Sequence, residues 1–256
     1  MTLVDVQVNP AVMEWPAVRD AALAAEAAGF GAFHVFDHLA GAALGGTTMI
    51  ECFSLLGALS EATTTIELGS MVANVWNRAP GTLVSAAASI VHLSGRPFHF
   101  GLGAGSSPTS GWAAEQHAAG HHVDHDVVVR HQRVADVLVL AAAEWSVDRP
   151  DALSTFPLPS PVPITLVGCN SVALADLAGR LAGGINVPWN HPRRPEILQA
   201  ATSAAGSRPF VTTAYHVYDR DLLDATHPKR AEMSQWGIDR LVLAEFGSSP
   251  SFPSSV

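Results

Sequence analysis

Short apolar segments alternate along this chain with longer segments rich in alanine and leucine. The short segments contain many β-branched and aromatic residues, which is typical of buried parallel strands, and the longer ones have the pattern of helices. The predicted strands are residues 3–8, the core of 29–39, 64–72, 98–102, 164–167, 184–187, 210–218 and 240–243. The predicted helices are residues 15–28, 50–62, 79–93, 127–145, 172–181, 195–205 and 228–236.

Glycine and proline residues support several of these boundaries. Pro16 lies in the first turn of the first predicted helix, and Gly29 directly follows its last residue. The longest irregular piece, residues 108–126, is rich in histidine and glycine. Its histidines, together with His131, have no matched set of carboxylate partners, so we expect a solvated lid rather than a metal site.

The alternation of strands and helices predicts a parallel sheet, and eight strands favour its closure into a (β/α)8 TIM barrel. The length of 256 residues fits one such domain. Few residues follow the last strand, so we expect a shortened C-terminal end, and a doubly wound open sheet is the alternative. We expect one barrel domain at residues 1–246 and a tail rich in serine and proline at residues 247–256 that need not be ordered.

The charge balance limits the expected partners. The net charge is −9, and the 14 lysine and arginine residues form no long basic run, so nucleic acid is not an expected partner. No apolar run is long enough to span a bilayer, and the first residues do not resemble a secretory signal. The 2 cysteines have no zinc-ligand spacing and predict no disulfide framework, so we expect a cytoplasmic protein without a membrane partner.

Asp37 and His38 are the first candidates for chemistry, because they follow the second predicted strand. The carboxyl ends of the strands form the active-site face of a barrel. Imidazole titrates near neutrality, so His38 could stabilise or protonate a developing charge, and the alternative is a histidine that caps a loop. Asp37 could bind a ligand, orient His38 or cap the loop that follows.

Two glycine-rich turns are the next candidates. Residues 101–107 do not fit the Rossmann pattern, since serine or proline stands where the last glycine would be required. Without Cβ atoms, the backbone of this turn would let a flat ring approach closely. The turn at residues 168–171 precedes a predicted helix, and its N–H groups suit a phosphate. The alternative is an ordinary turn with Ser171 as the helix N-cap.

Several stretches, taken in their order and spacing, resemble the luciferase-like flavin and deazaflavin oxidoreductases. The resemblance runs from Ala21 to Asn186 and returns near the end of the chain. It implies a (β/α)8 barrel, in agreement with the strand count. The stretches are Ala24–Phe30, Phe36–Leu39, Ile66–Ser70, Leu93–Arg96, Gly101–Gly105, Leu166–Ser171 and Gly237–Leu243.

The Asp37–His38 pair looks more like the branch of this family that uses the deazaflavin coenzyme F420. The resemblance therefore implies hydride transfer between coenzyme F420 and a small organic substrate, by an enzyme that forms a homodimer. Similar pairs occur in the flavin branch, so an FMN-dependent luciferase-like monooxygenase is the first alternative. The second is a catalytically silent barrel that only binds a flavin or a deazaflavin.

One departure from the family limits the substrate. The sugar-phosphate dehydrogenases of the F420 branch resemble this chain but carry a glutamate base after Gly-x-Gly, where this chain has Ser106. A serine cannot take the proton unaided, so the oxidation of glucose 6-phosphate is not expected. The missing glutamate also keeps the silent barrel open as an alternative.

The resemblance implies roles for particular residues. His38 is the expected catalytic residue, and no metal is expected. A non-prolyl cis peptide bond is expected at Met71–Val72, behind the coenzyme ring. The expected coenzyme-binding residues are Asp37, Met71, Val72, Asn74, Ala104, Gly105, Ser106, Gly168, Cys169, Asn170 and Ser171.

Overall fold

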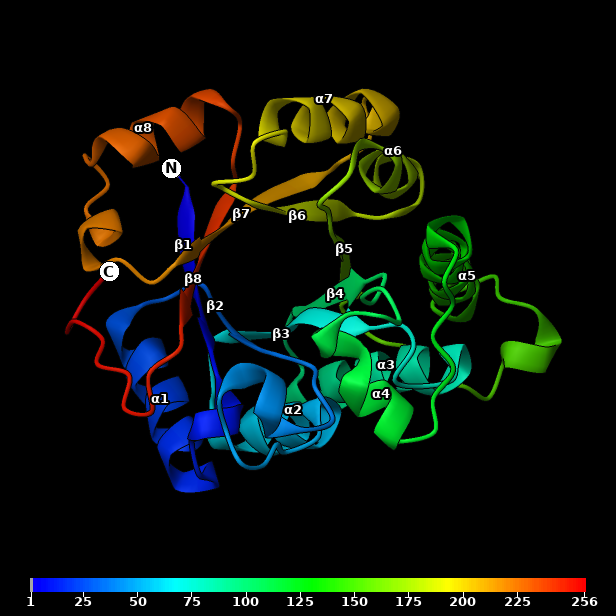
Figure 1. Cartoon of the computed structure of the whole chain (residues 1–256), viewed down its shortest axis with the longest axis horizontal. Coiled ribbons are helices and arrows are strands. Elements are labelled where there is room, and N and C mark those ends of the chain that lie inside the picture. The colour runs from blue at the N-terminus through cyan, green and yellow to red at the C-terminus, as the bar shows by residue number, and fades with distance from the viewer. Residues whose placement is uncertain (1) are drawn as a thin grey trace.

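Eight parallel strands close into a barrel in the computed structural model of this protein, which describes residues 2–256 (Figure 1). Each strand pairs with the next one in the sequence, and β8 completes the circle by pairing with β1. The predicted TIM barrel is therefore confirmed, and the open sheet is wrong. The strands are β1 (Leu3–Val8), β2 (Ala32–Val35), β3 (Glu67–Asn74), β4 (Phe98–Gly103), β5 (Ile164–Gly168), β6 (Gly184–Pro188), β7 (Val211–Val217) and β8 (Arg240–Glu245).

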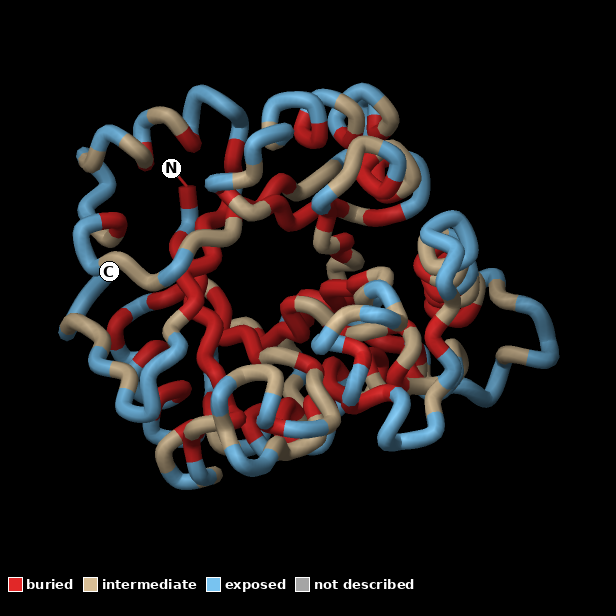
Figure 2. The backbone as a smooth tube through the Cα atoms, in the orientation of Figure 1, coloured by how far each residue is buried: buried red, intermediate tan, exposed pale blue. Residues whose placement is uncertain are grey.

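Helices cover the outside of this barrel (Figure 1). In Figure 2 the strands form an inner ring of mostly buried backbone, whereas the outer sides of the helices are exposed. No helix within residues 2–256 is long and apolar enough to cross a membrane. The α-helices are α1 (Trp15–Ala28), α2 (Cys52–Ala62), α3 (Pro80–Ser94), α4 (Ala114–Ala118), α5 (Val127–Glu144), α6 (Val172–Leu181), α7 (Arg194–Ala205) and α8 (Pro228–Gln235).

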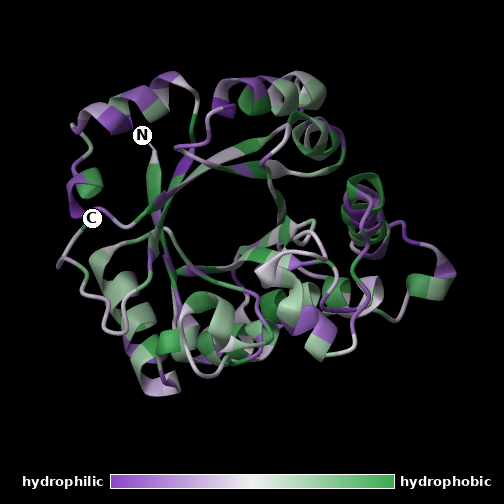
Figure 3. Cartoon of the chain, in the orientation of Figure 1, coloured by the Kyte–Doolittle hydropathy of each residue, from purple (hydrophilic) through white to green (hydrophobic). Residues whose placement is uncertain are grey.

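The helices differ in how much apolar surface they bring to the barrel. In Figure 3 hydrophobic residues dominate α6, whereas α8 carries many hydrophilic ones. Accordingly, α6 buries Leu174, Ala175 and Ala178, while α8 buries only Arg230 and Met233. Because apolar burial is the main stabilising contribution, α6 adds more to the core than α8 does.

Helix α1 shows how local signals determine the ends of an element. Pro16 occupies its first turn, where an N–H group is not needed for the helix. Gly29 follows its last residue with a φ of 88°, a left-handed conformation that favours glycine. Both ends of this helix agree with the prediction from the sequence.

Two segments differ from the prediction by more than one or two residues at an element end. Strand β3 begins at Glu67, later than predicted, because the N–H groups of residues 64–66 donate to the Glu26 carboxylate and not to a neighbouring strand. The piece predicted to be irregular contains α4, a helix of 5 residues. A helix this short gives no periodic hydrophobic pattern from which it could be predicted.

The segment after β8 packs on the barrel without forming a helix. The ring of Phe252 lies 5.2 Å from that of Phe30 and 6.0 Å from that of Tyr218. The N–H of Val256 donates to the carbonyl of Ala28 over 2.8 Å. These contacts hold the tail, red in Figure 1, against the end of α1.

Charged side chains fill the barrel interior near the amino-terminal ends of the strands. Asp5 accepts hydrogen bonds from Arg240 at 2.7 and 2.8 Å and lies 3.4 Å from Nε2 of His34. Nε2 of His99 lies 2.7 Å from Glu67, which is 2.9 Å from Arg240. Asp5, His34 and His99 are fully buried. We call these five residues the floor cluster.

Candidate active site

A cavity of about 390 Å³ opens at the carboxyl ends of β2 to β5, on the face where a barrel carries its active site. A second cavity of about 250 Å³ adjoins it, and the two share Val72, Gly168 and Asn170. The first cavity lies within the range of small-molecule sites, roughly 300–1,000 Å³. All the predicted site residues line one of these cavities, Met71 and Cys169 only the second.

Val72 lies between the two cavities and lines both of them. The pairing of β3 with β4 shifts register beside it, and the Met71–Val72 peptide bond is cis, as the resemblance implies. A Cβ atom on Gly103 would lie 2.7 Å from Cγ2 of Val72, and one on Gly168 would lie 3.1 Å from Cγ1. These glycines therefore make room for Val72. Gly103 also lines the first cavity, so the close approach of a flat ring to this turn stays a prediction.

His38 borders the first cavity and is held there by a glutamate of α4. Nδ1 of His38 lies 2.9 Å from Oε1 of Glu115. The other oxygen of Glu115 accepts hydrogen bonds from the N–H groups of Leu39 at 3.0 Å and Ala40 at 2.9 Å. Beside the pair, the ring of Trp112 lies 5.8 Å from that of His38. The loop after β2 and α4 are thus joined through one buried carboxylate.

Glu115 was not singled out from the sequence. It lies in the piece predicted to be irregular, and its contact with His38 joins positions 77 residues apart. The sequence holds one signal, since Glu115 is the only carboxylate between Glu67 and Asp124. A single isolated carboxylate does not say which side chain it meets.

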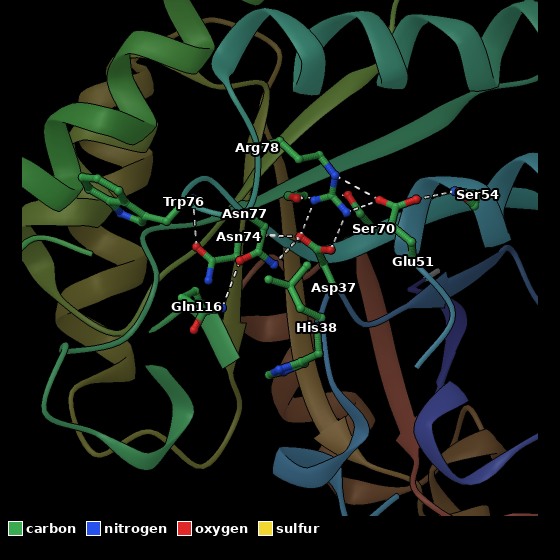
Figure 4. A network of polar contacts seen from close by, with 12 residues as sticks. Asp37, His38, Glu51, Ser54, Ser70, Asn74, Trp76, Asn77, Arg78 and Gln116 are labelled. Carbon is green, nitrogen blue, oxygen red and sulfur yellow. Dashed lines mark hydrogen bonds and ion pairs between the residues drawn. The ribbon is translucent and has the colours of Figure 1, made fainter. Parts of the chain in front are cut away.

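Asp37 also borders the cavity, but hydrogen bonds from this chain occupy both of its oxygens (Figure 4). Arg78 donates to both at 2.8 Å, and the N–H of Asn74 donates to one at 2.9 Å. Arg78 also pairs with Glu51. Although burial alone would lower it, the pKa of Arg78 is raised by these two carboxylates. Asp37 therefore orients its neighbours, and its contact with a coenzyme stays a prediction.

Trp76 joins the ends of β3 and β4 into one wall of the cavity. Its backbone N–H donates to Oδ1 of Asn74 at 3.0 Å, and its indole Nε1 donates to the carbonyl of Ala104 at 3.2 Å. Gly105 follows with a φ of 73°, and a Cβ atom there would lie 2.8 Å from Cδ1 of Trp76. Two of the predicted residues, Asn74 and Ala104, are therefore hydrogen-bonded to this tryptophan, and Gly105 leaves room for its ring.

The side of the cavity formed by α5 carries positive charge. Arg130 and His131 line it there. NH1 of Arg130 donates to the carbonyls of Asp124 at 3.0 Å and His125 at 3.1 Å, while its buried Nε has no acceptor in the described part of the chain. Burial and the charge of Arg130 lower the pKa of His131. The guanidinium of Arg130 lines the cavity, and a group of this kind suits a phosphate or another anion.

The turn before α6 faces the same cavity. Ser171 is the N-cap of α6, and its hydroxyl accepts a hydrogen bond from the N–H of Leu174 at 3.4 Å. The interpretation of Ser171 as a cap is thus confirmed, and phosphate binding by this turn stays a prediction. Cys169 is buried, and burial raises the pKa of its thiol, so the thiol remains neutral.

The histidines of residues 117–131 do not act as one group. Nε2 of His117 lies 2.9 Å from the carbonyl of Pro108, and the ring of His122 lies 5.9 Å from that of Trp76. His131 lines the cavity, which corrects its placement in a solvated lid. Across residues 2–256, no three histidine, cysteine, aspartate or glutamate side chains are grouped so that they could hold a metal ion.

Comparison with known sequences identifies the family of this chain. A family model described as luciferase-like monooxygenase matches residues 1–209. Since this is more than half of the sequence, the chain belongs to the luciferase-like monooxygenase family. No curated protein matches it.

Solved structures resemble the chain at low sequence identity. A coenzyme F420-dependent tetrahydromethanopterin reductase from Methanopyrus kandleri has a TM-score of 0.70 and 15% identity, over 95% of this chain and 93% of the other. An F420-dependent secondary alcohol dehydrogenase in complex with an F420–acetone adduct has a TM-score of 0.72 and 14% identity, over 99% of this chain and 94% of the other. A monooxygenase from Streptomyces bottropensis has a TM-score of 0.63 and 19% identity, over 91% of this chain and 77% of the other. These similarities show a shared fold.

Proposed function

We propose that this protein is an oxidoreductase that transfers hydride between coenzyme F420 and a small organic substrate. The observation that carries the proposal is the cavity at the carboxyl ends of the strands, with His38 held beside it by Glu115. Two proteins of the same fold are F420-dependent oxidoreductases. When bound, the deazaflavin supplies the position that accepts or donates the hydride.

The residues around the cavity fit such a coenzyme. The guanidinium of Arg130, which lines the cavity, and the start of α6 at Ser171 would hold an anionic tail. Val72 and His38 would border the ring, and Trp112 beside them would limit the entry of water. A small substrate then has the second cavity, which Phe36 and Tyr215 line together with Val72.

His38 would handle the proton of the reaction at the ring nitrogen that Glu115 does not bind. A neutral imidazole accepts a proton there, and an imidazolium donates one. The side chain is 18% exposed, so it is open to the cavity without being freely solvated. The buried carboxylate of Glu115 would hold the ring in one orientation while the proton moves at the other nitrogen.

An FMN-dependent monooxygenase is the second candidate. FMN also carries a phosphate that Arg130 could bind, and a monooxygenase shares the fold. A barrel that only binds a flavin or deazaflavin needs no carboxylate behind His38, so the contact with Glu115 disfavours it. Action as a homodimer in the cytoplasm stays a prediction from the resemblance and the composition.

Equilibrium titration followed by coenzyme fluorescence tests the proposal. We expect a lower dissociation constant for coenzyme F420 than for FMN, and the opposite order would replace the proposal by the monooxygenase. Arg130→Gln should weaken binding of the preferred coenzyme at least tenfold, because a hydrogen bond to a charged group contributes roughly 1.5–3 kcal/mol. Arg193→Gln is the control, since Arg193 pairs with Glu196 on the surface. Failure of both coenzymes to bind would overturn both candidates.

A further inference from the structure

Glu115 is surrounded by four hydrogen-bond donors. Oε1 lies 2.9 Å from Nδ1 of His38 and accepts from Nε2 of Gln116 at 2.9 Å. Oε2 accepts from the backbone N–H groups of Leu39 and Ala40. A carboxylate can only accept hydrogen bonds, so the imidazole nitrogen that faces it must carry a proton. The lone pair of the neutral ring is then on Nε2.

We infer that Glu115 is a positioning residue that sets the tautomer of His38, with the proton on Nδ1 and the lone pair of Nε2 facing the cavity. Nε2 forms no hydrogen bond with residues 2–256, and His38 lines the cavity. The ring nitrogen bound to a fixed partner determines which nitrogen stays free for chemistry. The inference rests on the proposed function only where Nε2 is assigned to the proton of the reaction.

The backbone contacts fix which oxygen position of residue 115 must be a hydrogen-bond acceptor. The N–H groups of Leu39 and Ala40 cannot be reversed, so they always require an acceptor at the position of Oε2. By contrast, the amide of Gln116, which also donates to Oδ1 of Asn77, can turn over together with that of Asn77, at the loss of the long 3.4 Å hydrogen bond from Asn77 to Asp37 (Figure 4). The backbone donors and His38 are therefore the main constraints on what can stand at position 115.

Replacing Glu115 by glutamine should therefore reverse the tautomer. A glutamine has a single acceptor oxygen, and the two backbone N–H groups require it at the position of Oε2. Its NH2 group then faces Nδ1 of His38, which must become the acceptor. The proton moves to Nε2, and the nitrogen that faces the cavity changes from an acceptor to a donor.

Nitrogen-15 NMR of the coenzyme-free full-length chain measures this directly at a pH of about 8.5, where an ordinary imidazole is neutral. Signals that disappear in His38→Gln identify the ring. We expect the Nδ1–H tautomer in the wild type and the Nε2–H tautomer in Glu115→Gln. Glu51→Gln is the matched control, because Glu51 contacts Arg78 and Ser54 but not His38, and it should keep the wild-type tautomer.

An Nε2–H tautomer in the wild type would overturn the inference on its own, even if Glu115→Gln failed to fold. An unchanged tautomer in a folded Glu115→Gln would overturn it as well. Since no coenzyme is present, either result is independent of whether the proposed function holds. In the F420-loaded enzyme, Glu115→Gln should lower kcat about a hundredfold while coenzyme affinity changes little. General acid–base catalysis typically raises the rate by a factor of about 10²–10⁴. Equal losses in kcat and affinity would assign Glu115 a merely structural part.

Discussion

Two ends of the same barrel pair buried carboxylates with histidines, and the two pairs differ in what can reach them. In the floor cluster, the side chains of His34 and Asp5 are 0% and 1% exposed. At the carboxyl ends of the strands, which we call the mouth, the side chains of His38 and Glu115 are 18% and 5% exposed. Both pairs join a histidine to a carboxylate, but of these two histidines His38 is the one that borders the cavity at the carboxyl ends of the strands.

The difference shows that unsatisfied hydrogen-bonding capacity needs access before it can serve chemistry. Nδ1 of His34 and Nδ1 of His99 have no partner within residues 2–256, yet they are sealed in the barrel. Nε2 of His38 is equally free of protein partners and faces the cavity. We therefore expect changes in the floor to act on stability and changes at the mouth to act on turnover.

Arg240→Met should give the largest effect and act on stability. It would remove the cation that donates two hydrogen bonds to Asp5, leaving that carboxylate charged and buried. Breaking a buried pair by removing one partner costs about 3–5 kcal/mol. Urea unfolding should show this loss in the free energy of unfolding.

Arg193→Met is the matched control for this substitution. Both side chains of the Arg193–Glu196 pair are more than half exposed, at 57% and 59%. Surface pairs contribute roughly 0–1 kcal/mol, so the control should unfold nearly as the wild type does. If Arg240→Met cost no more than Arg193→Met, the floor cluster would not stabilise the barrel as we describe.

His38→Ala should act at the mouth, on turnover. Charge stabilisation in an active site is commonly worth roughly 3 kcal/mol, so kcat should fall about a hundredfold. Coenzyme affinity should stay within severalfold, because Arg130 and the α6 turn hold the tail in the proposed function. Steady-state kinetics with coenzyme F420 and a demonstrated substrate provides the measurement.

The same substitution in the floor, His34→Ala, should reverse the pattern. His34 is fully buried and lines neither cavity of the mouth, so its loss should lower the free energy of unfolding and leave turnover per folded molecule unchanged. Unchanged turnover in His38→Ala would remove His38 from the mechanism. Equal turnover losses in both variants would abolish the distinction between the two ends.

The fold was predictable because its signals are local. The ends of α1 follow from Pro16 and Gly29, which act within a single helical turn. The start of β3 was misplaced because the carboxylate of Glu26 binds the N–H groups of residues 64–66 from another element. A β-branched run predicts a strand but contains no information on such a distant acceptor.

The candidate site was predictable only in part, for a related reason. Residues at a strand end, such as Asp37 and His38, were found because the barrel places every strand end on one face. Glu115 and Arg130 reach that face from α4 and α5, whose positions depend on how the long segment between β4 and β5 folds back. Their contacts join distant parts of the chain, and no spacing in the sequence encodes them.

The floor cluster also predicts how stability depends on pH. Burial alone would raise the pKa of Asp5, but hydrogen bonds from His34 and Arg240 outweigh it and lower the pKa to about 2. Burial lowers the pKa of His34, although Asp5 opposes this. For both groups the unfolded chain binds protons more readily than the folded one, so both contributions to stability are lost as the pH falls.

For Asp5 the loss falls between its ordinary pKa near 4 and its folded pKa of about 2. A lowered pKa of this size corresponds to about 2 kcal/mol, present above that window and lost below it. Asp5→Asn is less stable at neutral pH, since it weakens the bonds to Arg240, but its stability should fall less steeply in acid. Urea unfolding between a pH of about 6 and 2.5 should show the difference in the free energy of unfolding between wild type and Asp5→Asn shrinking by up to about 2 kcal/mol.

Asp20→Asn is the control, because it changes an exposed carboxylate beside Arg19. Its free energy of unfolding should fall with decreasing pH as that of the wild type does. A difference between wild type and Asp5→Asn that stays constant across the range would show that Asp5 does not couple protonation to folding.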